Sequence, residues 1–262
     1  MILEPAFIEG RLTLHVRVGC AGWNIPKQFA SEFASDGTHL QRYSRKFLCT
    51  EINSSFHRAH RFQTWQRWAE SVPENFQFSV KAPRAITHDG LLQPDRPKLN
   101  DFLQQIDLLR KKLGPILFQL PPSLQFDARR ITAFFTLLRE MHNGDVVLEP
   151  RHETWFQSCA GDLLTDFRIA RVAADPSIIP NAKDPGGWNG LVYFRLHGFP
   201  RKYYSAYDSD FLRSLATRMA HLSRVSHVWC IFDNTASGAA LGNALELHRL
   251  IFIAKRRYSQ ER

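Results

Sequence analysis

Several features that mark particular protein classes are scarce in this sequence. Cysteine occurs only four times in 262 residues, at widely separated positions and never as Cys-x-x-Cys, so neither a disulfide framework nor a cysteine-rich zinc site is indicated. No apolar run approaches the roughly 20 residues that cross a bilayer, and residues 1–10 lack the charged and apolar regions of a signal peptide. We therefore expect a cytoplasmic protein with reduced thiols and no membrane partner.

The composition and net charge indicate what kind of molecule the protein binds. The 44% hydrophobic and 23% charged content is that of a globular protein. Lysine and arginine total 34 against 25 acidic residues, and the formal charge of +9 attracts phosphate-bearing molecules, either a small anionic substrate or nucleic acid. Part of this charge lies at 110–112 and in a basic tail at 255–262, where a solvated surface is the simpler interpretation. Charge thus favours an anionic partner without identifying it.

Runs rich in β-forming residues recur along the whole chain. They lie at 16–19, 50–53, 76–81, 116–120, 146–149, 169–175, 191–197 and 228–233. Their mean spacing of about 30 residues is that of one strand, one crossover helix and two loops. Segment 176–190 stands apart, because its three prolines and three glycines leave no helical periodicity. The pattern predicts an α/β protein, a TIM-type (β/α)₈ barrel in which a long loop replaces the crossover helix after strand six.

Amphipathic patterns between the runs predict the crossover helices. They lie at 62–72, 99–113, 131–138, 211–222 and 241–253, and Asp127 is a suitable N-cap for the third. No low-complexity linker or shift in composition interrupts the series. We therefore expect a single domain over 1–262, with its core at about 16–254.

Polar residues stand at the end of nearly every predicted strand. Side chains alternate along a strand, so residues two apart point the same way, and one set should face the barrel mouth. This set comprises Glu51, Asn53, Ser55, Ser79, Lys81, Gln119, Glu149, Arg151, Asp175, Arg195, His197 and Asp233. Because unpaired buried ions are costly, their accumulation at one end predicts a functional site. Ion pairs that close the barrel are the structural alternative.

The same strand ends carry a family resemblance. Ordered motifs resemble those of the YecE-like family, domain of unknown function 72: VGCAGW at 18–23, TEINSSF at 50–56, FSVKAP at 78–83, FQLPP at 118–122, LEPRHETW at 148–155, YFRLHG at 193–198 and FDNT at 232–235. The resemblance runs from about 16 to 250 and implies a TIM-type barrel with a polar mouth, in a family without an established reaction. Two positions depart from the family pattern: Asp233 stands where asparagine is common, and Pro150 interrupts the strand-five motif.

Carried over by position, the resemblance implies a set of site residues at the mouth. They are Glu51, Asn53, Lys81, Gln119, Glu149, Arg151, His152, Trp155, Asp175, Arg195, His197 and Asn234. Among them we predict four catalytic residues, which are Glu51, Glu149, His197 and Asp175. The other eight are predicted to bind the substrate.

The first functional hypothesis is hydrolysis of, or transfer from, a phosphoester or nucleic-acid substrate. Arg151 and Arg195 would bind the anion. Glu149 or Glu51 would move the proton, and His197 would assist it. Small residues at 234–238 are expected to begin the helix after strand eight, where they either offer backbone N–H groups to a phosphate or cap the helix.

Three alternatives remain open. A divalent metal held by the strand-end carboxylates is not favoured, because the neighbouring arginines would repel it; we assign no metal ligand and leave the cofactor unknown. Metal-free chemistry on a sugar would use Glu51 and Glu149, with Trp23 and Trp155 as stacking platforms. A non-catalytic protein would bind nucleic acid or an anionic ligand through the basic aromatic loop 201–204, although a lid over the mouth suits the same loop.

Overall fold

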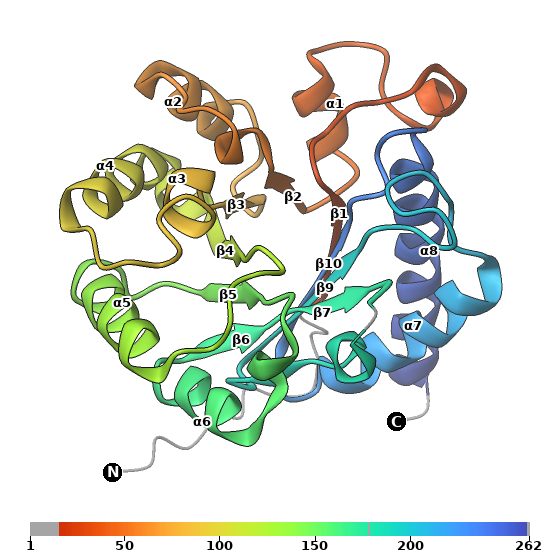
Figure 1. Cartoon of the computed structure of the whole chain (residues 1–262). Helices are drawn as coiled ribbons and strands as arrows, with labels where there is room; N and C mark the ends of the chain where they lie inside the picture. Colours follow the sequence, from red (N-terminus) through yellow and green to blue (C-terminus); the bar gives the residue numbers. More distant parts are fainter. Residues whose placement is uncertain (1–15, 178, 261–262) are drawn as a thin grey trace.

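The structure is a computed structural model that describes residues 16–177 and 179–260, with side chains up to residue 253. The chain has an α/β fold in which parallel strands alternate with helices (Figure 1). One sheet has the order β1 (Val16–Cys20), β10 (His227–Phe232), β9 (Leu191–Leu196) and β7 (Ala173–Asp175). The second has the order β2 (Cys49–Ile52), β3 (Gln77–Lys81), β4 (Leu113–Gln119), β5 (Val146–Glu149), β6 (Ile169–Arg171) and β8 (Gly186–Gly187). Only the pairing of β6 with β8 is antiparallel in the described part of the chain.

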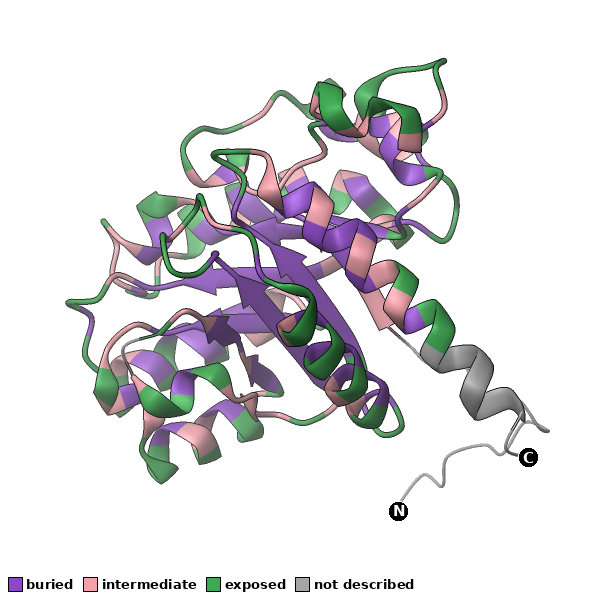
Figure 2. Cartoon of the chain, turned by 90° about the vertical axis from the view of Figure 1, so that its right-hand side faces the viewer, coloured by how far each residue is buried: buried purple, intermediate pink, exposed green. Residues whose placement is uncertain are grey.

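Helices surround the strands and follow one another in chain order (Figure 1). They are α1 (His39–Ser44), α2 (Phe62–Glu70), α3 (Arg84–Thr87), α4 (Arg96–Ile106), α5 (Ala128–Met141), α6 (Ser158–Asp166), α7 (Ser209–Leu222) and α8 (Ala239–Gln260). Side-chain caps fix several helix starts: the predicted cap Asp127 accepts hydrogen bonds from the backbone N–H groups of Arg129 and Arg130. Figure 2 shows the strands buried and the helices exposed on their outer side.

The predicted alternation of parallel strands and helices is confirmed, with local differences. β5 covers the predicted run 146–149, whereas the predicted run 169–175 is divided at Val172 into β6 and β7. The described residues of 176–190 form no α-helix; they contain the 3₁₀ turn η5 (Pro180–Lys183) and β8. Residues 255–260 of the predicted basic tail belong to α8. The last two residues of the tail and residues 1–10 lie outside the described residues.

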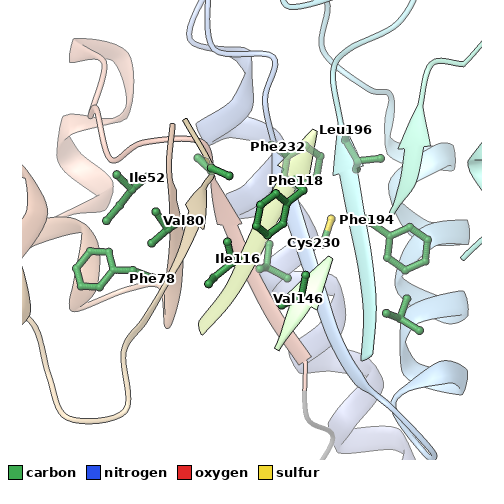
Figure 3. Close-up of a cluster of buried hydrophobic side chains, with 14 of the residues drawn as sticks. Ile52, Phe78, Val80, Ile116, Phe118, Val146, Phe194, Leu196, Cys230 and Phe232 are labelled. Atoms are coloured by element: carbon green, nitrogen blue, oxygen red, sulfur yellow. The ribbon is translucent and has the colours of Figure 1, made fainter. Parts of the chain in front are cut away.

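Alternation along the strands creates two apolar layers. One set of strand side chains packs against the helices; Ile52, Val80, Phe118, Phe194 and Phe232 belong to it (Figure 3). The opposite set forms a smaller buried cluster that spans both sheets: Cys49, Leu117, Val147, Ala170, Val172, Ala174, Leu191, Tyr193, Trp229 and Ile231. Five of these residues lie two positions before a predicted polar site residue. The inner cluster is therefore the apolar layer from which the polar strand ends project.

The two sheets approach each other at two places. At the first, Ala21 and Glu51 form a parallel bridge between the ends of β1 and β2, and the Gly22 N–H donates to the Glu51 carbonyl oxygen at 2.9 Å. Gly19 permits this approach, since a Cβ there would collide with the Cys49 carbonyl oxygen. At the second, one continuous segment contributes β6, which pairs with β5, and β7, which pairs with β9.

Candidate active site

The carboxyl ends of the parallel strands bring a set of polar side chains together. Each comes from the last residues of a strand or directly follows one, and together they are Glu51, Lys81, Gln119, Glu149, Arg195, His197 and Asp233. All seven are buried. Parallel strands end on the same edge of a sheet, so the alternation read from the sequence correctly predicts that these residues converge.

Arg195 is at the centre of this charge cluster. Its Nη2 lies 2.8 Å from Glu51 Oε1 and 3.1 Å from Asp233 Oδ2, and its Nη1 lies 3.2 Å from Glu149 Oε2. Burial alone would lower the pKa of Arg195, but the three carboxylates outweigh it and hold that pKa well above its usual value. The guanidinium is therefore a permanent cation that pairs with carboxylates at the ends of three different strands.

His197 joins two of the same carboxylates. Its Nδ1 lies 3.0 Å from Asp233 Oδ2, and its Nε2 lies 3.1 Å from Glu149 Oε1. Burial would raise the carboxyl pKa values, but for both groups Arg195 and His197 outweigh it, so the pKa of Glu149 is well below its usual value and that of Asp233 is also lowered. Each ring nitrogen of His197 thus has a carboxylate oxygen within hydrogen-bond distance, and the ring links the strand ends of β5 and β10.

Glu149 also connects the cluster to the solvent-exposed side of the site. Its Oε1 accepts hydrogen bonds from Gln119 Nε2 at 2.9 Å and from Arg151 Nη2 at 3.2 Å. The Arg151 side chain retains 25% exposure and has a second hydrogen-bond partner in Tyr203. Arg151 thus holds a buried carboxylate while it presents a cation to solvent.

Tyr193 is a site residue that the sequence prediction missed. Its hydroxyl lies 2.9 Å from both Glu51 Oε2 and Ser79 Oγ, and burial followed by the charge of Glu51 raises its pKa well above the usual value. The hydroxyl is thus a permanent hydrogen-bond donor on the apolar side of the cluster. The alternation rule contains its signal, because Tyr193 precedes Arg195 by two positions and so points the same way.

Lys81 differs from the other cations of the site. Its side chain is buried, with 7% of the residue exposed, and its Nζ lies 4.0 Å from the centroid of the Phe56 ring. No carboxylate among the described residues lies within ion-pair distance of it. Burial and the charge of Arg195 lower the pKa of Lys81 to about 8, although three nearby carboxylates oppose the shift.

Two more predicted residues lie at the edge of the cluster. Asn53 Nδ2 donates to Asp233 Oδ1 at 3.4 Å, while its Oδ1 is buried without a partner. Asp175 ends β7, and its Oδ1 accepts a hydrogen bond from the Tyr207 hydroxyl at 2.8 Å. That tyrosine also accepts a hydrogen bond from the Gly198 N–H, so the predicted catalytic Asp175 anchors the chain that follows β9.

Three predicted substrate-binding residues contact the core, a helical turn or a loop, and not the residues of the charge cluster. Trp155 is fully buried in the hydrophobic core, and its Nε1 donates to the Leu124 carbonyl oxygen at 2.8 Å. His152 caps the 3₁₀ turn η4 (Glu153–Phe156). Asn234 Nδ2 donates to the Ser205 carbonyl oxygen at 2.9 Å. The structure therefore does not bring these three to the charge cluster, and their predicted role in binding stays a prediction.

The loop after β9 covers part of the cluster. Tyr203 meets the His197 ring edge-to-face with centroids 5.6 Å apart, and the Arg201 guanidinium lies 3.9 Å from the centroid of the Tyr204 ring. The Ala236 N–H, in the segment after β10, donates to the Tyr203 carbonyl oxygen. The prediction that residues 234–238 begin the last helix is wrong, because α8 begins at Ala239 and those residues form the preceding turn.

The described residues include neither a cluster that could hold a metal ion nor a membrane-spanning helix. No group of three or more His, Cys, Asp or Glu among them is placed so that it could hold a metal ion. No helix in the described part of the chain combines the length and apolar character that crossing a bilayer requires.

Comparison with known proteins identifies the family. Residues 17–261 match the family described as "Protein of unknown function DUF72". UPF0759 protein YunF of Bacillus subtilis is 25% identical over 91% of this chain and 95% of its own length. UPF0759 protein YecE of Escherichia coli K12 is 26% identical over 54% of this chain and 50% of its own length.

Solved structures show the same fold. A DUF72 family protein from Enterococcus faecalis V583 has a TM-score of 0.78 at 18% identity, covering 90% of this chain and 95% of that one. A DUF72 family protein from Thermotoga maritima MSB8 has a TM-score of 0.74 at 23% identity, covering 90% of this chain and 99% of that one. The buried charge cluster described above thus belongs to a chain whose family match spans almost its whole length, and this chain is a member of the DUF72 family.

Proposed function

We propose that this protein is an enzyme with an acid–base site at the carboxyl ends of its strands, acting on an anionic, phosphate-containing substrate by hydrolysis or transfer. The observation that carries the proposal is a pair of cations at the charge cluster that its carboxylates do not fully engage. Arg151 is partly exposed, and Lys81 has no carboxylate partner among the described residues. Two such cations favour an oxyanion at this position, because each gains a charge-assisted hydrogen bond from it.

We also infer that the two sheets belong to one closed (β/α)₈ barrel. The bridge between Ala21 and Glu51 joins them on one side, and the segment that contains β6 and β7 joins them on the other. The inner apolar cluster draws residues from both sheets. In such a barrel the mouth at the carboxyl ends of the strands is where active sites occur.

The roles of the two arginines differ in this proposal. The sequence predicts that both bind the substrate, yet the Arg195 donors are occupied by Glu51, Glu149 and Asp233. We assign Arg195 the role of a positioning residue that fixes the carboxylates. Arg151, with its exposed edge, remains the proposed contact for the anion.

Proton transfer falls to a group whose pKa lies near neutrality. The pKa of Glu149 is held well below its usual value, which makes it a weak base and a strong electrostatic partner for His197. Lys81, with a pKa of about 8, exchanges a proton readily at neutral pH. We therefore propose Lys81 as the proton carrier, with His197 and Glu149 setting the local field.

A substrate panel tests the proposal. Wild type, Lys81→Gln, Glu149→Gln and the surface control Lys98→Gln are assayed on phosphomonoesters, phosphodiesters and neutral glycosides. We expect turnover of a phosphoester by wild type and by Lys98→Gln, with a loss of about 10²-fold or more in Lys81→Gln. Cleavage of a neutral glycoside alone, lost in Glu149→Gln, would establish the sugar alternative instead. Salt-sensitive nucleic-acid binding without any turnover would establish the binding alternative.

A further inference from the structure

Lys81 is the only buried lysine among the described residues. Lys46 Nζ lies 2.8 Å from Glu32 Oε2, and Lys98 Nζ lies 2.9 Å from Asp95 Oδ2. Lys112 Nζ donates to two backbone carbonyl oxygens at 2.7 Å. Lys81 has neither kind of partner among the described residues, and its Nζ faces the ring of Phe56. A buried ammonium group with no ion-pair or hydrogen-bond partner is costly, so Lys81 gives up its proton more readily than an exposed lysine does.

The charges around Lys81 come from four strand ends and from the end of one helix. They are Glu51 on β2, Glu149 on β5, Arg195 on β9, Asp233 after β10 and His88 after α3. Burial and Arg195 dominate, and they lower the pKa of Lys81 from 10.5 to about 8. At neutral pH the fraction of free amine is then on the order of a few hundred times that of an ordinary exposed lysine. A neutral amine at an enzyme mouth is a nucleophile toward carbonyl carbon.

We propose that Lys81 forms an imine with an aldehyde or ketone substrate that also carries an anionic group, which Arg151 binds. The anionic half of this inference rests on the proposed function above, while the imine half rests on the burial of Lys81 and on its lack of an ion-pair or hydrogen-bond partner among the described residues. The substrates of this site are then small phosphorylated or otherwise anionic carbonyl compounds. Lys81 has a covalent role in addition to proton transfer.

The reaction balances without any added oxidant or reductant. The Nζ lone pair forms the new C–N bond while the carbonyl π electrons move to oxygen, and a proton passes from nitrogen to that oxygen to give a carbinolamine. A second proton adds to the hydroxyl group, the C–O bond breaks with its electrons, and one water leaves. The nitrogen lone pair forms the C=N bond of a protonated imine. That cation lies in the field of Glu51, Glu149 and Asp233, which stabilises it.

Borohydride trapping tests both halves of the inference. Full-length protein is incubated with glycolaldehyde phosphate or with neutral glycolaldehyde and reduced with sodium borohydride, and the modified lysines are located by peptide mass spectrometry. We expect Lys81 to carry at least tenfold more adduct than the paired, 44% exposed Lys98. Lys81→Arg keeps the charge and should lose the adduct at that position only. Circular dichroism of this variant establishes that it is folded.

The possible outcomes distinguish imine formation at Lys81 from anion binding by Arg151. Preference for glycolaldehyde phosphate that disappears in Arg151→Gln supports both halves. Equal trapping of the two aldehydes at Lys81, unchanged in Arg151→Gln, supports the imine and overturns the proposed anionic substrate. Labelling that follows surface exposure, with little at Lys81 from either probe, overturns the imine. A trapping rate at Lys81 that rises with a midpoint near pH 8, against a higher midpoint at Lys98, supports the neutral amine as the reacting form.

Discussion

Replacing Arg195 by methionine should lower the free energy of unfolding by about 3–5 kcal/mol at pH 7, because removal of one partner leaves buried charge uncompensated. Glu51 has its only ion pair among the described residues with Arg195, and its side chain is fully buried. The expected loss is a large share of the about 5–15 kcal/mol that typically stabilises a domain. The assay is urea unfolding followed by circular dichroism, with exposed Arg45→Met, which breaks a surface pair with Asp36, as the control. That control should leave the unfolding midpoint nearly unchanged, because exposed ion pairs contribute little to stability.

The deficit should also depend on pH. In wild type the pKa values of Glu149 and Asp233 are lowered, so their contribution to stability is present above their unfolded pKa values, 4.5 and 3.8, and is lost as pH falls through the lower folded values. Without Arg195, burial favours the protonated, neutral form of both carboxyl groups. Acidification therefore removes the cost of unpaired buried charge in the variant, while it lowers the free energy of unfolding of wild type. The difference between the two proteins should therefore shrink from pH 7 to pH 4. A loss below about 1 kcal/mol at pH 7, or a deficit constant with pH, would refute the reasoning.

Further predictions concern individual residues around the cluster and core. Tyr193→Phe removes a hydroxyl shared by two polar groups and should cost about 1–3 kcal/mol in urea unfolding; an unchanged midpoint would contradict this. Gly19→Ala places a methyl group against a backbone oxygen of β2 and should lower the melting temperature, whereas Gly161→Ala in α6, where the added methyl group meets open space, should not. A thiol reagent should modify Cys159 rapidly in the native protein and leave the three buried cysteines unmodified, since burial raises the pKa of Cys20 to about 12. Rapid modification of all four would contradict the described burial.

Much of the fold is predictable because strand residues obey short-range rules. The run 146–149 is buried on both faces and reads as a strand without any tertiary information. The run 169–175 shows the limit, because its division at Val172 depends on which neighbour each half pairs with, β5 or β9. The short helices α1 and α3 have no long periodic pattern, so sequence reasoning did not find them.

The sequence predicts which residues belong to the site better than it predicts which of them pair with one another. The alternation of side chains placed Glu51, Glu149 and Arg195 on one face, and the structure brings them together. No local rule shows that Arg195 pairs with a carboxylate 144 positions away, and this pairing is what removes it from the proposed substrate contacts. The family motif predicts Trp155 as a binding residue, but its aromatic ring packs in the core, where burial of apolar area stabilises the fold.

Calorimetric titration of glycerol 3-phosphate into wild type, Arg151→Gln and Arg224→Gln tests the central claim most directly. Arg224 is exposed in the turn before β10, at the opposite end of the strands, and provides the matched control. The account predicts saturable binding that Arg151→Gln weakens by about tenfold or more, the effect of one charge-assisted hydrogen bond, and that Arg224→Gln leaves unchanged. Equal binding by all three proteins, or no binding of the phosphoester by wild type, would contradict it.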